Sequence, residues 1–170
     1  MELSIIVAAD ENNGIGAEGN QPFFIRSDLK RFKSLTTGNT IVMGRKTFEA
    51  LPNGALPNRK NIVLTHRAQY DAPNCRLINN PEELNQLCAA EEKVFVIGGG
   101  EIYRNFLPRV DRIYLTRVHS SFGGIDTWFP EISPDQWVVQ DQEGPFTDEK
   151  SGLVYSYINF RRKPGQSIQS

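Results

Sequence analysis

An acidic side chain, Asp28, lies among apolar residues in the first third of the chain. Residues 27–35 are predicted to form a helix with Ser27 as its N-cap. At about 100° per residue, Asp28, Phe32 and Leu35 share one helix face. A carboxylate on such a face must find hydrogen-bond donors or take up a proton, and either condition is useful for catalysis. The plainer interpretation, favoured by this segment alone, is that Asp28 only complements the helix dipole.

Two predicted strand-to-helix turns carry residues suited to phosphate groups. The apolar residues 94–97 run into three glycines at 98–100, directly before a helix. Glycines allow backbone N–H groups to approach a diphosphate closely. Residues 41–43 lead in the same way through Gly44 into Arg, Lys and Thr at 45–47. A tight turn explains either segment alone, but two of them in a small domain indicate a ligand with more than one phosphate.

Two further basic positions follow apolar residues. Thr65, His66 and Arg67 come directly after a predicted strand and could bind another phosphate, although a solvated loop explains this cluster equally well. Arg59 follows a turn that contains Pro57. Its guanidinium is suited to a bidentate grip on a carboxylate, whereas an isolated arginine is more often a surface residue.

Residues 14–19 have the literal spacing G-x-G-x-x-G after a strand. A dinucleotide-binding fingerprint must open a helix, yet no helical pattern begins before Ser27. The next predicted strand should end in an acid for the ribose hydroxyls, but it ends in Met43-Gly44-Arg45. These glycines are therefore predicted to form a mobile loop.

Length and charge narrow the class of protein. A chain of 170 residues is expected to form one domain with a sizeable core. The formal net charge of −1 argues against nucleic acid or a membrane surface as partner. No apolar run approaches the roughly 20 residues of a membrane span, and no signal peptide is visible. Cys75 and Cys88 form neither a disulfide framework nor a metal-ligand pattern, so a reduced, cytoplasmic setting is expected. A monomer is expected because the pattern shows no exposed apolar patch.

Apolar runs alternate with helical patterns over the first two thirds of the chain. Continuous apolar strands separated by helices predict an α/β fold with a mostly parallel sheet covered on both faces. The alternating pattern of the last third predicts antiparallel strands. Strands are expected at residues 4–8, 40–43, 61–64, 76–78, 93–97, 112–118, 137–142 and 153–160, and helices at 28–35, 46–51, 81–90 and 101–107.

With these features in place, the chain resembles the dihydrofolate reductases over roughly residues 1–160. The segments that carry the resemblance are Ile15-Gly16 with Pro22, Asp28-Leu29 with Phe32-Lys33, residues 43–49 with 56–61, residues 96–103 and, more weakly, residues 126–130. The resemblance implies a three-layer domain over residues 1–161 and a flexible tail at 162–170. Its central eight-stranded sheet is mostly parallel, with an antiparallel C-terminal strand and about four flanking helices.

The resemblance also implies NADPH-dependent reduction of the small-molecule substrate 7,8-dihydrofolate to 5,6,7,8-tetrahydrofolate. Asp28 would hydrogen-bond the pterin ring, and the hydroxyl of Thr116 would hold that carboxylate. Hydride would pass to pterin C6 and a proton to N5, with water as the proton donor and Asp28 tuning the ring. Arg59 would hold the glutamate carboxylate. The other substrate-binding residues would be Ile6, Val7, Phe32, Leu51 and Leu56.

On the cofactor side, the family carries a cis peptide bond between the first two glycines of the triplet. The resemblance implies that residues 98–100 and 45–47 cradle the diphosphate and that Thr65, His66 and Arg45 bind the 2′-phosphate. Residues 11–24 would close over the nicotinamide ring. The implied cofactor-binding residues are Ala8, Ile15, Gly16, Gly44, Arg45, Lys46, Thr47, Leu64, Thr65, His66, Ile97, Gly98, Gly99, Gly100, Glu101, Ile102 and Tyr103.

The sequence departs from the family pattern at several positions, among them Gln21 and Phe24, and it has one extra residue between Thr116 and Asp126. Phe23 stands where most relatives have a tryptophan whose N–H helps to order a water. Phenylalanine cannot donate this hydrogen bond, so the proton route and the response to antifolate inhibitors are expected to differ from those of the family. Glu101 stands where some relatives have an arginine. Two alternatives remain: a non-catalytic protein that binds pterin and NADPH, and the pyrimidine reductase of riboflavin synthesis on the same fold.

Overall fold

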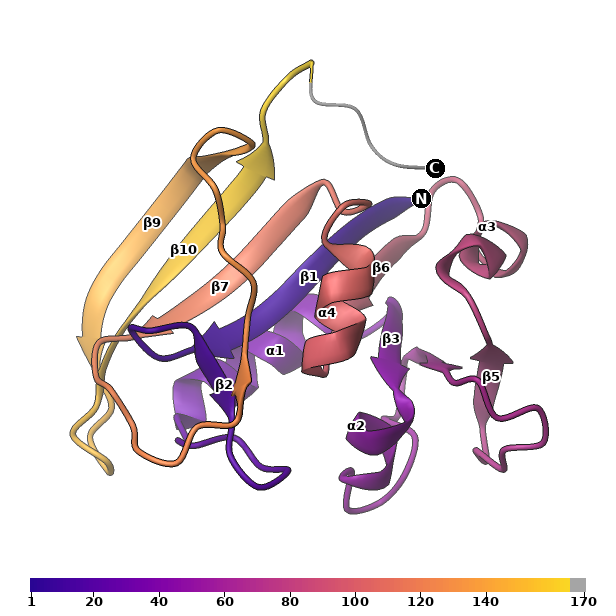
Figure 1. Cartoon of the computed structure of the whole chain (residues 1–170), viewed down its shortest axis with the longest axis horizontal. Coiled ribbons are helices and arrows are strands. Elements are labelled where there is room, and N and C mark those ends of the chain that lie inside the picture. Colours follow the sequence, from indigo (N-terminus) through magenta and orange to yellow (C-terminus); the bar gives the residue numbers. More distant parts are fainter. Residues whose placement is uncertain (166–170) are drawn as a thin grey trace.

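The computed structural model describes residues 1–165, and an eight-stranded sheet forms its centre (Figure 1). The strand order is β5-β4-β3-β6-β1-β7-β10-β9. β10 is antiparallel to both of its neighbours, and the other pairs are parallel, which confirms the predicted sheet. The strands of this sheet are β1 (Glu2–Ala9), β3 (Thr40–Gly44), β4 (Lys60–Leu64), β5 (Cys75–Ile78), β6 (Lys93–Val96), β7 (Arg112–Val118), β9 (Trp137–Thr147) and β10 (Val154–Arg162).

Helices lie on both faces of the sheet and complete the three layers. Figure 1 shows α4 in front of the sheet and α1 behind it. The described helices are α1 (Arg26–Thr36), α2 (Arg45–Glu49), α3 (Leu84–Leu87), α4 (Gly100–Phe106) and the 3₁₀ turn η1 (Pro81–Glu83). The predicted helix at 81–90 is thus divided, with a capping box between Asn80 and Glu83 at its start.

The central strands are apolar throughout because both of their faces are buried. In β3, Val42 packs into one core cluster with Phe106 of α4, whereas its neighbours Ile41 and Met43 pack into another with Phe48 of α2. Successive side chains of a strand point to opposite faces, so a strand between two helical layers needs apolar residues at every position. This is the physical reason for the continuous apolar runs.

The start of α1 differs from the prediction. The helix begins at Arg26, its N-cap is Ile25, and no side chain caps it. Ser27 lies inside the first turn, so the predicted N-cap is wrong. The predicted face is otherwise found: Asp28, Phe32 and Leu35 are partly buried.

Two short strands were not predicted. β2 (Gly14–Gly16) and β8 (Thr127–Trp128) pair as a separate antiparallel sheet at the lower edge of Figure 1. Segments of two or three residues carry no periodic signal. At the other end of the chain, the expected tail begins at Arg162, which is the last residue of β10, and residues 166–170 lie outside the described part. No helix within residues 1–165 has the length and apolar character needed to cross a bilayer.

Candidate active site

The loops that follow β3, β4 and β6 meet at one edge of the sheet and enclose a cavity of about 470 Å³. Ligands of open α/β sheets bind at this carboxyl edge. Eleven of the residues expected to bind the cofactor line the cavity: Gly44, Arg45, Lys46, Thr47, Leu64, Thr65, His66, Gly99, Gly100, Glu101 and Ile102. Its wall also contains Arg67, which the sequence placed in a basic cluster, and Thr127, from the weakly matching segment 126–130. Arg104 and Asn105, which the sequence did not single out, complete the wall.

Two of the glycines at this edge, Gly44 and Gly100, leave no room for a side chain. A Cβ at Gly44 would lie 2.7 Å from Cγ1 of Ile102, and a Cβ at Gly100 would lie 2.6 Å from Cγ2 of Thr127. Gly98 has a φ of +126°, and the peptide bond from Gly98 to Gly99 is cis, as the resemblance implied. The two turns touch, because the N–H of Gly44 donates to the Gly98 carbonyl at 2.9 Å. Bare backbone therefore forms part of the cavity wall.

Positive side chains surround this backbone. Arg45 donates to both oxygens of Glu49, at 2.9 and 3.1 Å, and the hydroxyl of Tyr70 donates to the same carboxylate at 2.8 Å. These hydrogen bonds from Tyr70 and Arg45 lower the pKa of Glu49. His66 and Arg67 are exposed on the loop after β4. An anion with several phosphate oxygens fits this combination of cations and backbone donors.

The carboxyl group of Asp28 on α1 lies against β7 and is not among the groups that line this cavity. The Thr116 hydroxyl donates to Oδ1 of Asp28 at 2.5 Å, although the two residues are 88 positions apart. Burial raises the pKa of Asp28, and the hydrogen bond from Thr116 and the charge of Arg31 lower it by smaller amounts. Arg31 is itself held by Asn159 and lies 4.1 Å above the ring of Tyr157. Asp28 is thus a partly buried carboxyl group with a fixed orientation.

Tyr103 of α4 contacts both β1 and the glycine turn. Its hydroxyl donates to the Ile6 carbonyl of β1 at 2.8 Å, and the same oxygen is 3.3 Å from the position of a Cβ at Gly98. Burial, with a smaller effect of the Asp28 charge, raises the pKa of Tyr103. The phenol therefore stays neutral and connects β1 to the glycine turn.

The expected substrate-side residues divide between the two faces of the sheet. Ile6, Leu51 and Leu56 are partly buried and pack against the cluster that contains Phe48. Val7 is buried in the opposite cluster, so its side chain does not share their surface. Phe32 lies one turn after Asp28 on α1 and is partly buried.

Arg59 lies at the far end of α1. Its Nη1 donates to the hydroxyl of Thr36, the last residue of that helix, at 3.1 Å, and its Nε donates to the Pro57 carbonyl at 2.9 Å. At a rise of 1.5 Å per residue, Asp28 and Thr36 are about 12 Å apart along the helix. A ligand that reaches both Asp28 and Arg59 must therefore be elongated and lie along α1.

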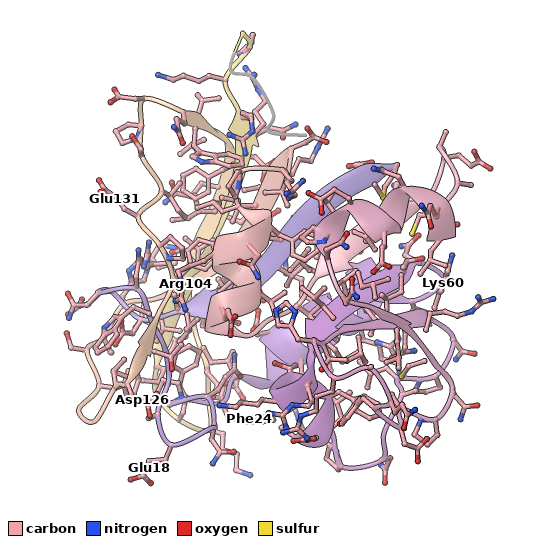
Figure 2. The ribbon with its side chains drawn as sticks, turned by 45° about the vertical axis from the view of Figure 1, so that its right-hand side comes forward. Glu18, Phe24, Lys60, Arg104, Asp126 and Glu131 are labelled. Carbon is pink, nitrogen blue, oxygen red and sulfur yellow. The ribbon has the colours of Figure 1, made fainter. Side chains whose placement is uncertain are left out.

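The remaining expected cofactor residues, Ala8, Ile15, Gly16, Ile97, Gly98 and Tyr103, do not line the cavity itself. Ile15 is near its edge, because its Cδ1 is 4.0 Å from the position of a Cβ at Gly100. The loop that carries it is held to β8: the Gly16 carbonyl accepts from the N–H of Asp126 at 3.0 Å, and the Asp126 carboxylate accepts from the N–H of Glu18 at 2.8 Å. Figure 2 shows Glu18 and Asp126 close together.

A buried polar cluster under the same loop escaped the sequence analysis. The carboxylate of Asp10, which is 1% exposed, accepts from the N–H groups of Asn12 and Gly14 at 2.9 and 2.7 Å. Arg117 donates to the Asp10 carbonyl and to Oδ1 of Asn13, both at 2.7 Å. Since Arg117 is about a hundred residues from the loop in sequence, no local pattern could have shown the contact. The cluster holds the start of the loop against β7.

The two adjacent phenylalanines at the end of the loop differ. Phe23 is buried, and its ring centroid is 5.5 Å from that of Phe122. Phe24 is 59% exposed. Neither ring can donate a hydrogen bond to a water near Asp28. The second histidine, His119, is exposed and contacts the Ser156 hydroxyl at 2.8 Å, away from these groups.

Comparisons with known proteins give one consistent result. The family model described as dihydrofolate reductase matches residues 2–162. The dihydrofolate reductase of Bacillus subtilis is 37% identical over 161 residues, which are 95% of each chain. That of Staphylococcus haemolyticus is 36% identical over 162 residues, 95% of this chain and 96% of the relative. Among solved structures, dihydrofolate reductase from Enterococcus faecalis complexed with NADP(H) and RAB-propyl matches with a TM-score of 0.86 and 37% identity, over 95% of this chain and 96% of that one.

Proposed function

The chain belongs to the dihydrofolate reductase family and catalyses the NADPH-dependent reduction of 7,8-dihydrofolate to tetrahydrofolate, and we propose that the Asp28–Thr116 pair and the glycine-lined cavity perform this reaction. The family match leaves the pyrimidine reductase of riboflavin synthesis without support. The observation that carries the proposal is the hydrogen bond of 2.5 Å from Thr116 to Asp28, made on a partly buried helix face.

Asp28 is the catalytic carboxyl group of the proposal, with Thr116 as the residue that orients it. A carboxylate oxygen of Asp28 accepts hydrogen bonds from the 2-amino and N3 side of the pterin, each worth about 1.5–3 kcal/mol. Because burial raises the pKa of Asp28, a larger fraction of it carries a proton at neutral pH than for an exposed aspartate. Thr116 holds the group in one orientation. Water delivers the proton to N5, and the hydrogen bonds from the pterin to Asp28 adjust the electron distribution of the ring so that N5 can accept this proton.

The cofactor site fits a dinucleotide with three phosphates in all. When bound, NADPH supplies the hydride for pterin C6. The backbone at residues 98–100 and the side chains of residues 45–47 hold the diphosphate, where a Cβ at Gly44 or Gly100 would collide. Thr65 and His66, helped by Arg45, bind the 2′-phosphate and so favour NADPH over NADH.

The substrate lies along α1 in this proposal. Ile6, Phe32, Leu51 and Leu56 contact its pterin and benzoyl groups, and only the backbone of Val7 can do so, because its side chain is buried on the other face. Arg59, about 12 Å along the helix from Asp28, binds the glutamate carboxylate. Antifolate inhibitors that carry a protonated ring would meet the same carboxylate of Asp28.

We also propose the setting in which the enzyme acts. One domain over residues 1–161 contains all of the residues named above, so no second copy is needed to complete the site and the protein works as a monomer. Its setting is the cytoplasm. Cys75 and Cys88 are free thiols, and burial raises the pKa of each. Unreactive thiols of this kind fit a reducing compartment.

The test is NADPH oxidation by the full chain with dihydrofolate as substrate, together with binding of each ligand alone. We expect turnover that depends on both ligands. Tight binding of both without turnover would instead support a non-catalytic binding protein in which Phe23 marks lost activity. Failure to bind dihydrofolate would contradict the proposed substrate site.

A further inference from the structure

We propose that Arg104 binds the diphosphate group of the cofactor and supplies the positive charge on the α4 side of the cavity. This inference rests on the proposed function, because it requires NADPH in the cavity. Arg104 lies in the middle of α4, where Figure 2 labels it, and lines the cavity. Neither the glycine motif nor the basic clusters of the sequence include it.

The guanidinium lies beside the bare backbone of the glycine turn. Helical side chains point toward the N-terminus of their helix, and residues four apart share a face. Nη1 of Arg104 is accordingly 3.6 Å from the position that a Cβ at Gly100 would take. That position is also 2.6 Å from Thr127. Because Gly100 has no side chain, Thr127 and the guanidinium of Arg104 both approach the backbone of the glycine turn, and from there the guanidinium can reach an anion bound at the cavity wall.

The charge of Arg104 is not neutralised by the protein. Within residues 1–165, no hydrogen bond or ion pair involves the side chain of Arg104. Arg45, on the opposite wall, differs, because it is already paired with Glu49. Glu101, one residue after the glycines, brings a negative charge to the same wall. An unpaired arginine offers a planar fork of donors to phosphate oxygens, so Arg104 is the group on this wall that can offset Glu101.

The position of Arg104 assigns it to one of the two phosphate sites. It projects from α4 at the glycine turn, whereas His66 and Arg67 follow β4. NADPH and NADH share the diphosphate and differ in the 2′-phosphate. A residue at the diphosphate must therefore affect both cofactors equally, and a residue at the 2′-phosphate must affect NADPH alone.

The experiment is to measure dissociation constants of NADPH and NADH for the full-length parent, R104Q and R104K. We expect R104Q to weaken the binding of both cofactors by the same factor, about three- to fivefold, since an exposed charge contributes less than the 1.4 kcal/mol that corresponds to tenfold in affinity. R104K keeps the charge and should lose less.

Two further variants make the comparison specific. R67Q should weaken NADPH binding and leave NADH unchanged, and R76Q, at an exposed arginine of β5 outside the cavity, should change neither. Unchanged binding of both cofactors by R104Q would overturn the proposal, and so would a loss confined to NADPH. If the parent bound neither cofactor, the proposed function itself would be contradicted, and the assignment of Arg104 with it. If the parent bound both cofactors and R104Q bound them equally well, only the assignment of Arg104 would be contradicted.

Discussion

The proposed substrate side and the proposed phosphate side of this enzyme are built in different ways. On the substrate side, one carboxyl group is partly buried and is held by one hydroxyl from a strand 88 positions away. On the phosphate side, exposed cations and bare backbone come from turns that are each continuous in sequence. A function that depends on one buried group is sensitive to a single substitution. A function shared among several exposed charges loses little with each of them, since exposed ion pairs contribute about 0.2–1 kcal/mol.

The largest effect is therefore expected for Asp28→Asn. The variant cannot ionise or carry the proton, and we expect kcat/KM to fall by about 10²- to 10⁴-fold, most strongly near neutral pH. The measurement is steady-state NADPH oxidation between pH 5 and 9. Asp71→Asn, at an exposed position, is the control. A variant with parental activity at pH 7 would contradict the role of Asp28.

Asp28→Asn should lower the activity but raise the stability of the protein. Because burial raises the pKa of Asp28, the folded protein keeps the proton to a higher pH than the unfolded chain does. The stability contribution of this group is lost as pH rises from the unfolded pKa, about 3.9, through the folded one. Asp28→Asn should therefore be more stable than the parent at pH 8, with a difference that shrinks at pH 4. Urea unfolding at the two pH values measures this.

On the phosphate side, the largest effect is expected at Gly100, where the packing allows no side chain. Gly100→Ala places a methyl group 2.6 Å from Cγ2 of Thr127, and relieving such an overlap costs about 1–3 kcal/mol. We expect the dissociation constant of NADPH to rise by roughly 10- to 100-fold. Gly123→Ala, where nothing lies within 4 Å, is the matched control. Adding Thr127→Ser removes Cγ2 and should restore part of the affinity; no restoration would mean that the overlap is not the cause.

Removal of the hydroxyl that holds Asp28 should have a smaller effect. The hydrogen bond from Thr116 favours the ionised carboxylate, so Thr116→Val should raise the pKa of Asp28 further. We expect kcat/KM to fall about tenfold, with the pH profile moved to higher pH. Thr116→Ser keeps the hydroxyl and should retain most of the activity. A profile moved to lower pH in the valine variant would contradict the assignment.

The smallest effect is expected at the exposed end of the phosphate side. His66→Gln removes one of several polar groups from the proposed 2′-phosphate site. We expect the preference for NADPH over NADH to fall by about two- to fivefold while kcat stays unchanged. Ratios of KM for the two cofactors measure this. A loss as large as that of Gly100→Ala would show that the charges on this side are not shared.

How well the sequence predicted each region follows from how local its signal is. The central strands were found because burial on both faces demands apolar residues at each position, and the glycine turns because their motif is continuous. Thr116 was located only through the family resemblance, since no local pattern connects it with Asp28. The prediction of Ser27 as the N-cap is wrong. The helix begins at Arg26, and the extended residue before it, Ile25, has no side chain that could cap it, so the residue type gave no signal for the true start.

The positions that escaped prediction depend on contacts between distant segments. Arg104 has the pattern of an exposed helix residue, and only the fold brings it beside Gly100. Asp10 and Arg117 form a buried polar cluster whose members lie on different strands or loops. β2 and β8 are too short for any periodicity, and only their pairing defines them.

The most direct test is the titration of the Asp28 carboxyl group itself. Carbon-13 NMR of the protein labelled at aspartate, with Asp28→Asn used to assign the signal, gives its pKa in the parent and in Thr116→Val. We predict a pKa above that of an exposed aspartate, about 3.9, in the parent and a still higher one in the valine variant. A parent pKa at or below the ordinary value would contradict a partly buried, proton-holding Asp28 at the centre of the active site.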